Sequence, residues 1–257
     1  MPTAAYIGTV AHPVPVEWVD SVSVSVEGRY TIQSAPARSW AFVTRPGGVP
    51  TPRSWDVAMR IGNATRANLD ALAMGAFGNG PFFWLPESAY ITNAITPRQS
   101  LLLDRTGGGV AAVEGWAPRS ALGPAVATLA TGVPVLPGSP VTLSVDASGA
   151  STLRAVFRNA AGTMVANPSI GADGTLMQRL HLTVASAPPT ARTVDLQVAG
   201  HSVATRPQVT WLRGPVPWAP GAGADSVVLE KLDATTLHLD GRGDVMLSAT
   251  MTLQEVG

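Results

Sequence analysis

The chain has 257 residues, of which 46% are hydrophobic and 13% carry a charge, and its formal net charge is zero. This length suggests about two domains, and the charged fraction is about half of that in typical soluble domains. A neutral chain lacks the basic excess that neutralises phosphates, so sequence recognition of nucleic acid is not expected. The absence of cysteine excludes disulfides and thiolate metal sites.

The N-terminal sequence has no basic stretch followed by an apolar core, so no signal peptide is expected. No stretch approaches the roughly 20 apolar residues of a membrane-spanning helix, so no membrane insertion is expected either. The low charge instead favours a subunit that packs against copies of itself or against neighbouring proteins. Sixteen arginines against a single lysine, Lys231, indicate a GC-rich coding sequence.

Two strands and one helix are predicted in the N-terminal part of the chain. Trp18–Val26 alternates valine with serine, and Ser54–Ile61 alternates in a similar way, which is typical of strands with one buried face. A helix follows, and Asn63 or Thr65 can cap the free N–H groups of its first turn. The aromatic segment Pro81–Pro86 is then expected to form a strand or a wedge packed under the helix.

The glycine-rich residues 104–116 mark the expected domain boundary, which divides the chain into 1–105 and 106–240. Short strands at regular spacing follow, and seven of them in roughly 100 residues indicate a β-sandwich of the jelly-roll type. They are Val141–Val145, Leu153–Arg158, Leu180–Val184, Val194–Val198, Val209–Leu212, Val227–Leu232 and Leu237–Leu239.

The final alternating segment, Val245–Leu253, is predicted to form the last strand. We hypothesise that it returns to the first domain, so that residues 241–257 complete that domain. The reason is that Val227–Leu239 already resembles the closing strand pair of a jelly roll, which leaves the last strand without a partner there.

Residue patterns for catalysis or cofactor binding are missing. The four histidines, His12, His181, His201 and His238, have no metal-ligand spacing and are expected to be solvated strand residues. No nucleophile elbow, phosphate-binding loop or dinucleotide-binding fingerprint occurs. A structural calcium ion is an alternative, with Asp173 as the first candidate ligand. We therefore assign no catalytic, cofactor-binding or metal-binding residue, and we predict that the protein is not an enzyme.

Tryptophan is the more informative residue type, with seven in the chain. An exposed tryptophan can stack on a sugar, and a buried one can anchor an interface. Trp211 and Trp218 flank the loop Arg213–Pro217, so both are candidates for contact with a glycan or a partner, and Trp218 is expected to be the more exposed of the two.

Short motifs in both halves of the chain carry a resemblance to one family. Four of them resemble the N-terminal part of distal tail (minor tail) proteins of long-tailed phages whose hosts are high-GC actinobacteria: Arg53–Val57, Asn68–Leu72, Gly78–Leu85 and Asn93–Pro97. Three more resemble the carbohydrate-binding-module-like jelly roll of that family, and a fourth its last strand: Val135–Gly138, Pro207–Thr210, Trp218–Gly223 and Leu247–Val256.

The resemblance implies a mainly β protein, with a tail-tube-like β-sandwich or split barrel that carries one helix, followed by a β-sandwich jelly roll. It implies a structural virion protein at the phage tail tip, assembled in the host cytoplasm as a ring, commonly a hexamer. The ring would join the tail tube protein to the tape measure and to the hub or tail-tip proteins. The jelly roll would project outward and contact host surface glycans or other tip proteins.

Two other functions are compatible with the sequence. The first is a stand-alone carbohydrate-binding adhesin module, and the second is a glycan hydrolase of the jelly-roll type. Fold does not decide among these functions.

Overall fold

The computed structural model describes residues 4–26, 30–34, 40–44, 52–78, 80–103, 110–111, 120–123, 125–239 and 245–256. The protein is mainly β and is built from antiparallel sheets, which confirms the predicted fold class. In the described residues, no helix is both long enough and apolar enough to cross a membrane.

The chain forms two compact units, and each is drawn from more than one segment. Unit 1 comprises Met1–Thr9, Val14–Phe82 and Ser226–Gly257, and unit 2 comprises Val10–Pro13 and Phe83–Asp225. The main divisions therefore fall after Phe82 and after Asp225, and not after residues 105 and 240. The expected boundary at residue 105 lies outside the described residues.

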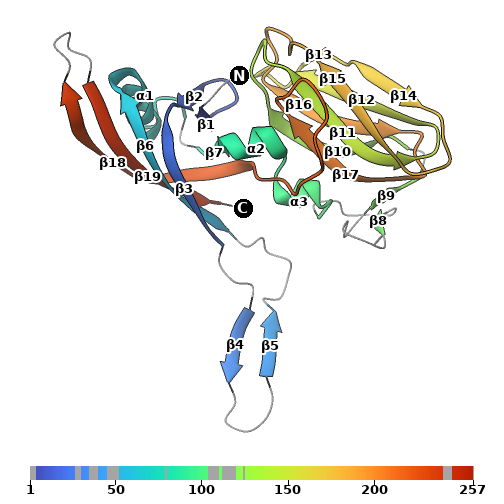
Figure 1. Cartoon of the computed structure of the whole chain (residues 1–257), viewed down its shortest axis with the longest axis horizontal. Helices are drawn as coiled ribbons and strands as arrows, with labels where there is room; N and C mark the ends of the chain where they lie inside the picture. The colour runs from blue at the N-terminus through green and yellow to red at the C-terminus, as the bar shows by residue number, and fades with distance from the viewer. Residues whose placement is uncertain are drawn as a thin grey trace. The chain divides into compact units, whose positions relative to one another are not determined.

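A seven-stranded sheet has the order β2-β1-β7-β18-β19-β6-β3. Its strands are β1 (Ala5–Gly8), β2 (Pro13–Val16), β3 (Val19–Val26), β6 (Arg53–Gly62), β7 (Phe82–Leu85), β18 (Ala224–Leu239) and β19 (Val245–Glu255). The strands β4 (Tyr30–Ser34) and β5 (Trp40–Thr44) pair with each other in a separate two-stranded sheet (Figure 1).

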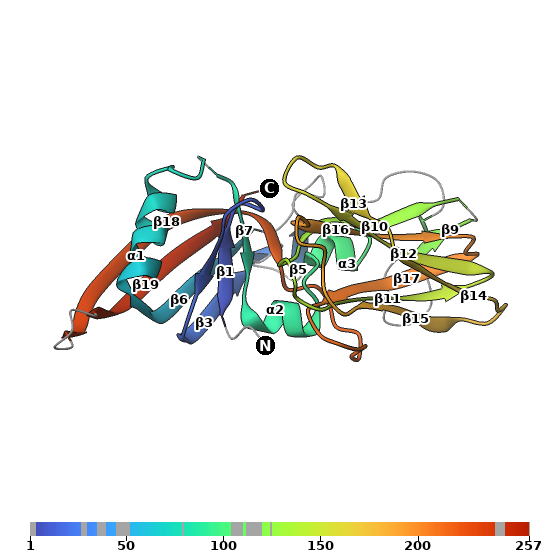
Figure 2. The ribbon, with the colours of Figure 1, turned by 90° about the horizontal axis from the view of Figure 1, so that it is seen from above.

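The core of unit 1 lies on one face of β6. The alternation predicted for this strand is confirmed, because Trp55, Val57, Met59 and Ile61 are each 1% exposed. The helix α1 (Asn63–Ala73) packs against β6 and β19 and buries Leu69 and Leu72 (Figure 2). Its N-cap residue is Gly62, which has no side chain, so the predicted capping by Asn63 or Thr65 is wrong.

The last strand, β19, lies between β18 and β6. Leu253 is opposite Trp55 of β6 on one side and opposite Leu229 of β18 on the other. The C-terminal segment therefore does pair with a strand from the N-terminal part of the chain. The two short strands predicted at 227–232 and 237–239 are one continuous strand, β18, which belongs to this sheet and not to the jelly roll.

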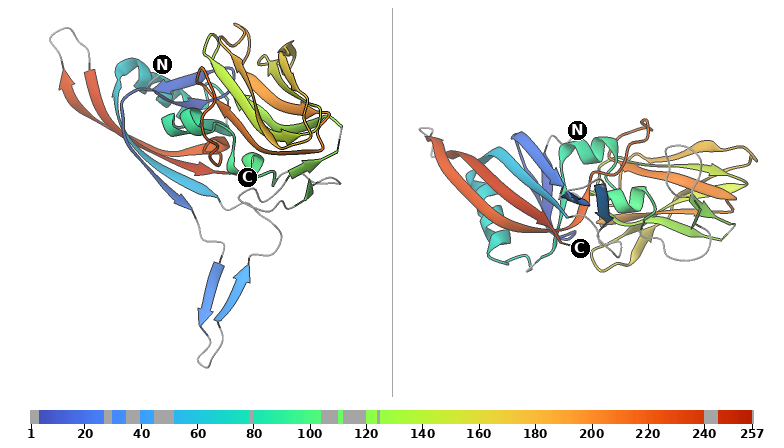
Figure 3. Two further views of the ribbon diagram at one scale, coloured as in Figure 1. Left: turned by 45° about the vertical axis from the view of Figure 1, so that its right-hand side comes forward. Right: turned by 90° about the horizontal axis from the view of Figure 1, so that it is seen from below.

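Unit 2 is a β-sandwich of two five-stranded sheets, which face each other in Figure 3. One has the order β10-β16-β12-β13, with β14 also paired to β12, and the other has the order β15-β11-β17-β9-β8. The strands are β8 (Val110–Ala111), β9 (Ser120–Leu122), β10 (Ala127–Pro134), β11 (Val141–Ser148), β12 (Ser151–Arg158), β13 (Met164–Ala166), β14 (Ser169–Ala172), β15 (Gln178–Val184), β16 (Thr193–Ala199) and β17 (Val203–Thr210).

The sandwich is held by apolar side chains that point between the two sheets. Leu143 and Val145 of β11 and Phe157 of β12 are fully buried, as is Leu196 of β16. Two short helices, α2 (Glu87–Thr92) and α3 (Pro97–Ser100), precede the sandwich in the chain and contact β17. These helices place residues 92–96 next to the polar residues of β17.

Candidate functional site

Trp211 lies in the core of unit 2. Its side chain is 1% exposed, its ring stacks on that of Tyr90 with centroids 4.8 Å apart, and its Nε1 donates to the carbonyl of Pro134 at 3.2 Å. The prediction that Trp211 contacts a glycan or a partner is therefore wrong, because its side chain is buried. Its role is to hold α2 against the end of β17.

Trp218 is half-buried. Its Nε1 donates to the carbonyl of Pro207 at 3.3 Å, and the guanidinium carbon of Arg206 lies 5.9 Å from the ring centroid. Such a geometry is a cation–π contact. The predicted role of Trp218 in contact with a glycan or partner stays a prediction, but its surroundings are now defined.

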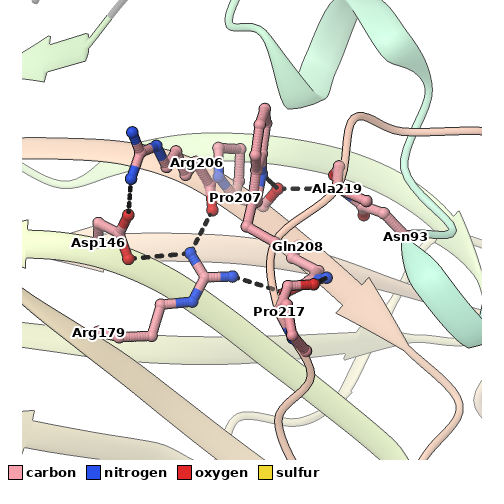
Figure 4. A network of polar contacts seen from close by, with 9 residues as sticks. Asn93, Asp146, Arg179, Arg206, Pro207, Gln208, Pro217 and Ala219 are labelled. Atoms are coloured by element: carbon pink, nitrogen blue, oxygen red, sulfur yellow. Dashed lines mark hydrogen bonds and ion pairs between the residues drawn. The ribbon is translucent and has the colours of Figure 1, made fainter. Parts of the chain in front are cut away.

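Two arginines, Arg179 and Arg206, share the carboxylate of Asp146 (Figure 4). The Asp146 carboxylate accepts from Arg179 at 3.0 Å and from Arg206 at 3.3 Å, and its side chain is only 14% exposed. Burial lowers the pKa of Arg179, against the opposing effect of Asp146, which raises it. The three residues come from neighbouring strands, since β11 lies between β15 and β17.

Arg206 has an unusual backbone. Its φ is +53°, a left-handed conformation that non-glycine residues rarely adopt. The pairing of β11 with β17 shifts register at this point, between the Ser144 and Asp146 pairs, which marks a β-bulge. Bulges redirect side chains and are common next to binding sites. The Nε atom of Arg206 is buried without a hydrogen-bond partner in the described residues.

The network continues from Arg179 through Gln208 to the chain around Trp218. Arg179 donates to Oε1 of Gln208 at 2.6 Å, and Nε2 of Gln208 donates to the carbonyls of Thr92 and Pro217. Gln208 is 1% exposed, so its side-chain amide is shielded from water. The network thereby fixes the loop that presents Trp218 to the polar face of the β15-β11-β17 sheet.

Asn93 completes the attachment of this loop. Its Nδ2 donates to the carbonyls of Pro207 and Ala219, and its Oδ1 accepts from the backbone N–H groups of Ile95 and Val209. The side chain is fully buried, and its full hydrogen-bonding capacity is used. A buried amide with four partners acts as a structural clamp.

The segments 93–96 and 221–223 lie directly against each other. The N–H of Ala222 donates to the carbonyl of Asn93, the N–H of Gly223 to that of Ile95, and the N–H of Gly221 to the hydroxyl of Ser100. A Cβ atom on Gly221 would collide with the carbonyl oxygens of Ile95 and Thr96. Two motifs that are far apart in the sequence thus form one tightly packed junction.

A second surface lies at the edge of the sheet in unit 1. Val22 and Val24 of β3 are 36% and 52% exposed, and they lie opposite the buried Val57 and Trp55 of β6. Opposed residues of an antiparallel pair share a face of the sheet, so the buried apolar face of β6 continues onto β3, where it meets solvent. β3 is at the end of the sheet order.

Trp18 precedes this edge strand and is 57% exposed. Its φ is +48°, and its carbonyl accepts from the N–H of Arg60 at 3.0 Å, next to a register shift in the pairing of β3 with β6. Sequence reasoning did not single out this residue. A register shift between Val19 and Ser21 follows it, which the alternation of valine and serine does not reveal.

The remaining sequence candidates do not gather into a site. Among the described residues, no group of three or more histidine and acidic side chains could hold a metal ion. His12 and His181 are exposed as expected, but His201 is 1% exposed and belongs to the core. Asp173 is exposed in the turn before β15.

One surface hollow of unit 2 lies between β10 and the segment around Ile95. Its cavity volume is about 10 Å³, far below the roughly 300–1,000 Å³ of ligand pockets. Most of its lining residues are apolar, and Gln99 and Asp225 are its longer polar residues.

No protein-family model matches the chain, and no curated protein is similar to it in sequence. Among solved structures, it is similar to the enzymatically active domain of tailspike protein 4 of bacteriophage CBA120, with 10% identity and a TM-score of 0.26. The match covers 82% of this chain and 20% of the other, so the chain spans about a fifth of that neighbour. At this TM-score the likeness carries no argument about fold or function, and the resemblance to distal tail proteins stays a prediction.

Proposed function

We propose that this chain is a structural protein of a long-tailed phage, which assembles into a ring at the distal end of the tail tube. In this proposal, unit 1 forms the ring and connects the tube to the tail tip, and unit 2 projects outward. The chain has no catalytic role. The proposal rests on the family resemblance in the sequence and on one structural observation: β3 ends the sheet of unit 1 and has no further strand beside it among the described residues.

The edge strand β3 supports self-association on physical grounds. It offers exposed valines on a face that is buried one strand further in, and it ends a sheet of seven strands. Proteins that stay monomeric usually protect such edges with charge, proline or bulges. β3 has a register shift and one charged residue, Asp20, at its start, whereas its residues 21–25 carry no charge. Association with a second copy would bury Val22 and Val24 and would satisfy the open strand edge.

Oligomeric state tests this proposal. We expect purified protein to form closed rings in negative-stain electron microscopy, with a single assembly mass by mass photometry. Val24→Asp should dissociate the ring, because it places a charge on the apolar face of the edge strand. Ser21→Asp on the opposite face of the same strand is the matched control and should leave the ring intact. A protein that stays monomeric at high concentration would refute the proposal.

The alternative, a stand-alone carbohydrate-binding adhesin, is favoured by the half-buried Trp218 and its neighbour Arg206 in unit 2. It predicts glycan binding by a monomer that never assembles. The same mass measurement, combined with glycan binding, separates the two functions.

A further inference from the structure

We propose that Arg206 and Trp218 form a binding site for a sugar unit that carries a carboxylate, on the surface of unit 2. The inference rests on the outward-projecting role proposed for this unit, and it adds the chemical class of its ligand. Four features of the same few residues support it.

The first feature is an imbalance of charge. Arg179 and Arg206 both contact Asp146, so two cations share one anion in a partly buried environment. The side chains of Asp146 and Arg179 are 14% and 26% exposed, which limits compensation by water. Buried charge is costly unless it is paired. One unit of positive charge is left over, and it matches the single negative charge of a carboxylate.

The second feature is the incomplete hydrogen bonding of Arg206. A guanidinium has five N–H donors. In Arg206 the Nε donor is buried without a partner among the described residues, and Nη1 makes a long bond of 3.3 Å to Asp146. Arg179 is different, because it donates to Asp146, to the carbonyl of Arg206 and to Gln208. The side chain of Arg206 is 35% exposed, so the donors that can reach a ligand are those of its Nη atoms.

The third feature is the bulge that holds Arg206 in a left-handed backbone conformation. Alternate residues of a strand share a face, so residue 206 is expected on the face that carries Gln208. The register shift puts Thr205 opposite Asp146, and the guanidinium of Arg206 lies beside the Asp146 carboxylate (Figure 4). Backbone strain of this kind persists where the surrounding structure enforces it and is common at ligand sites.

The fourth feature is the tryptophan itself. Trp218 is anchored through Nε1 and lies beside the guanidinium of Arg206, and part of its side chain is exposed. An aromatic ring suits the apolar face of a sugar ring, and a guanidinium binds a carboxylate through two parallel hydrogen bonds. The two groups lie close enough for one sugar residue to contact both.

Titration calorimetry with tetragalacturonate, and with maltotetraose as the uncharged control, tests the assignment. We expect the protein to bind tetragalacturonate, to bind maltotetraose at least about tenfold more weakly, and to lose affinity for the uronate as salt is added. Arg206→Gln should weaken uronate binding by at least about tenfold. Arg206→Lys should restore only part of the affinity, because an ammonium group cannot form the paired hydrogen bonds.

Arg154→Gln is the matched control, since Arg154 lies on β12 of the other sheet and makes no contact with this cluster. It should bind tetragalacturonate like the unmodified protein. The inference is overturned if tetragalacturonate does not bind at about 10 mM, if maltotetraose binds equally well, or if Arg206→Gln binds like Arg154→Gln. Mass photometry of the same samples separates this inference from the proposed function. If the protein forms rings but does not bind the uronate, the ligand assignment fails and the proposed ring function stands.

Discussion

Substitution of Gly221 by alanine is expected to destabilise unit 2 strongly. The new Cβ would collide with the carbonyl oxygen of Ile95 and would lie 2.6 Å from that of Thr96. These atoms belong to the backbone, so no side chain can rotate away. Overpacking typically costs about 1–3 kcal/mol, and a collision with backbone should reach the upper end of that range. The hydrogen bond from Gly221 to Ser100, at 2.8 Å, would also be weakened.

Gly214→Ala is the matched control in the same segment. A Cβ on Gly214 would have no atom within 4 Å, and the residue does not need a positive φ. Both substitutions reduce the entropy of the unfolded chain equally. The difference between the two variants therefore isolates the collision at Gly221.

Thermal unfolding followed by tryptophan fluorescence gives the measurement. A loss of about 3 kcal/mol lowers Tm by roughly 6–12 °C for a unit of this size. Gly221→Ala should therefore melt that far below Gly214→Ala. If the two variants melt within about 1 °C of each other, the junction between segments 93–96 and 221–223 does not hold unit 2 together as described.

Three further predictions concern stability. Asn93→Ala removes four buried hydrogen bonds and should cost about 2–5 kcal/mol in urea unfolding of unit 2; a loss below about 1 kcal/mol would contradict its role as a clamp. Arg53 donates to Glu255 at 2.9 and 2.7 Å, and both side chains are largely buried, so Arg53→Met should cost about 1.5–3 kcal/mol of stability. Arg60→Met breaks the exposed pair with Asp20 and should cost under about 1 kcal/mol. Equal losses in the two variants would refute this difference. Burial, with a smaller effect from Glu17, raises the pKa of Tyr6. The contribution of Tyr6 to stability is therefore complete below about pH 10 and is lost as the pH rises through the folded-state pKa. Unfolding at alkaline pH should depend less on pH in Tyr6→Phe, and an unchanged dependence would contradict this prediction.

Local patterns predicted five of the ten strands described in the sandwich: β11, β12, β15, β16 and the end of β17. The short strands predicted at 141–145 and 153–158 lie within β11 and β12. Residues 141–145 of β11 are all buried, whereas buried and half-buried residues alternate over 151–155 of β12. The short strands β13 and β14 were not predicted. Their residues are mostly exposed on both faces, so they have no alternation that a sequence pattern could detect.

The sheet to which a strand belongs could not be read from its pattern. Alternation in 227–232 and 245–253 gives the face of each strand but not its neighbours. The sequence suggested that the last strand returns to the N-terminal part, and its pairing with β6 agrees with this. The same reasoning assigned β18 to the jelly roll, where it does not belong.

The exposure of the tryptophans shows where sequence reasoning reached its limit. Trp211 and Trp218 flank the same loop, but Trp211 is buried because Tyr90, far away in the sequence, stacks on its ring. The motif Asn93–Pro97 was singled out only by its resemblance to a family motif. In the structure, Asn93 binds the loop before Gly221, and Thr96 caps α3 by accepting from the N–H of Gln99.

The path of the chain through the seven-stranded sheet has a consequence for biosynthesis. β6 emerges from the ribosome about 200 residues before its partner β19, whose Leu253 pairs with Trp55. At a translation rate of about 5–20 residues per second, β19 is synthesised roughly 10–40 s after β6. Nearly all of unit 2 has been synthesised by then. Unit 2 can thus fold co-translationally, whereas the sheet of unit 1 closes only once β19 has been synthesised. The apolar face of β6 is therefore prone to aggregation during this interval.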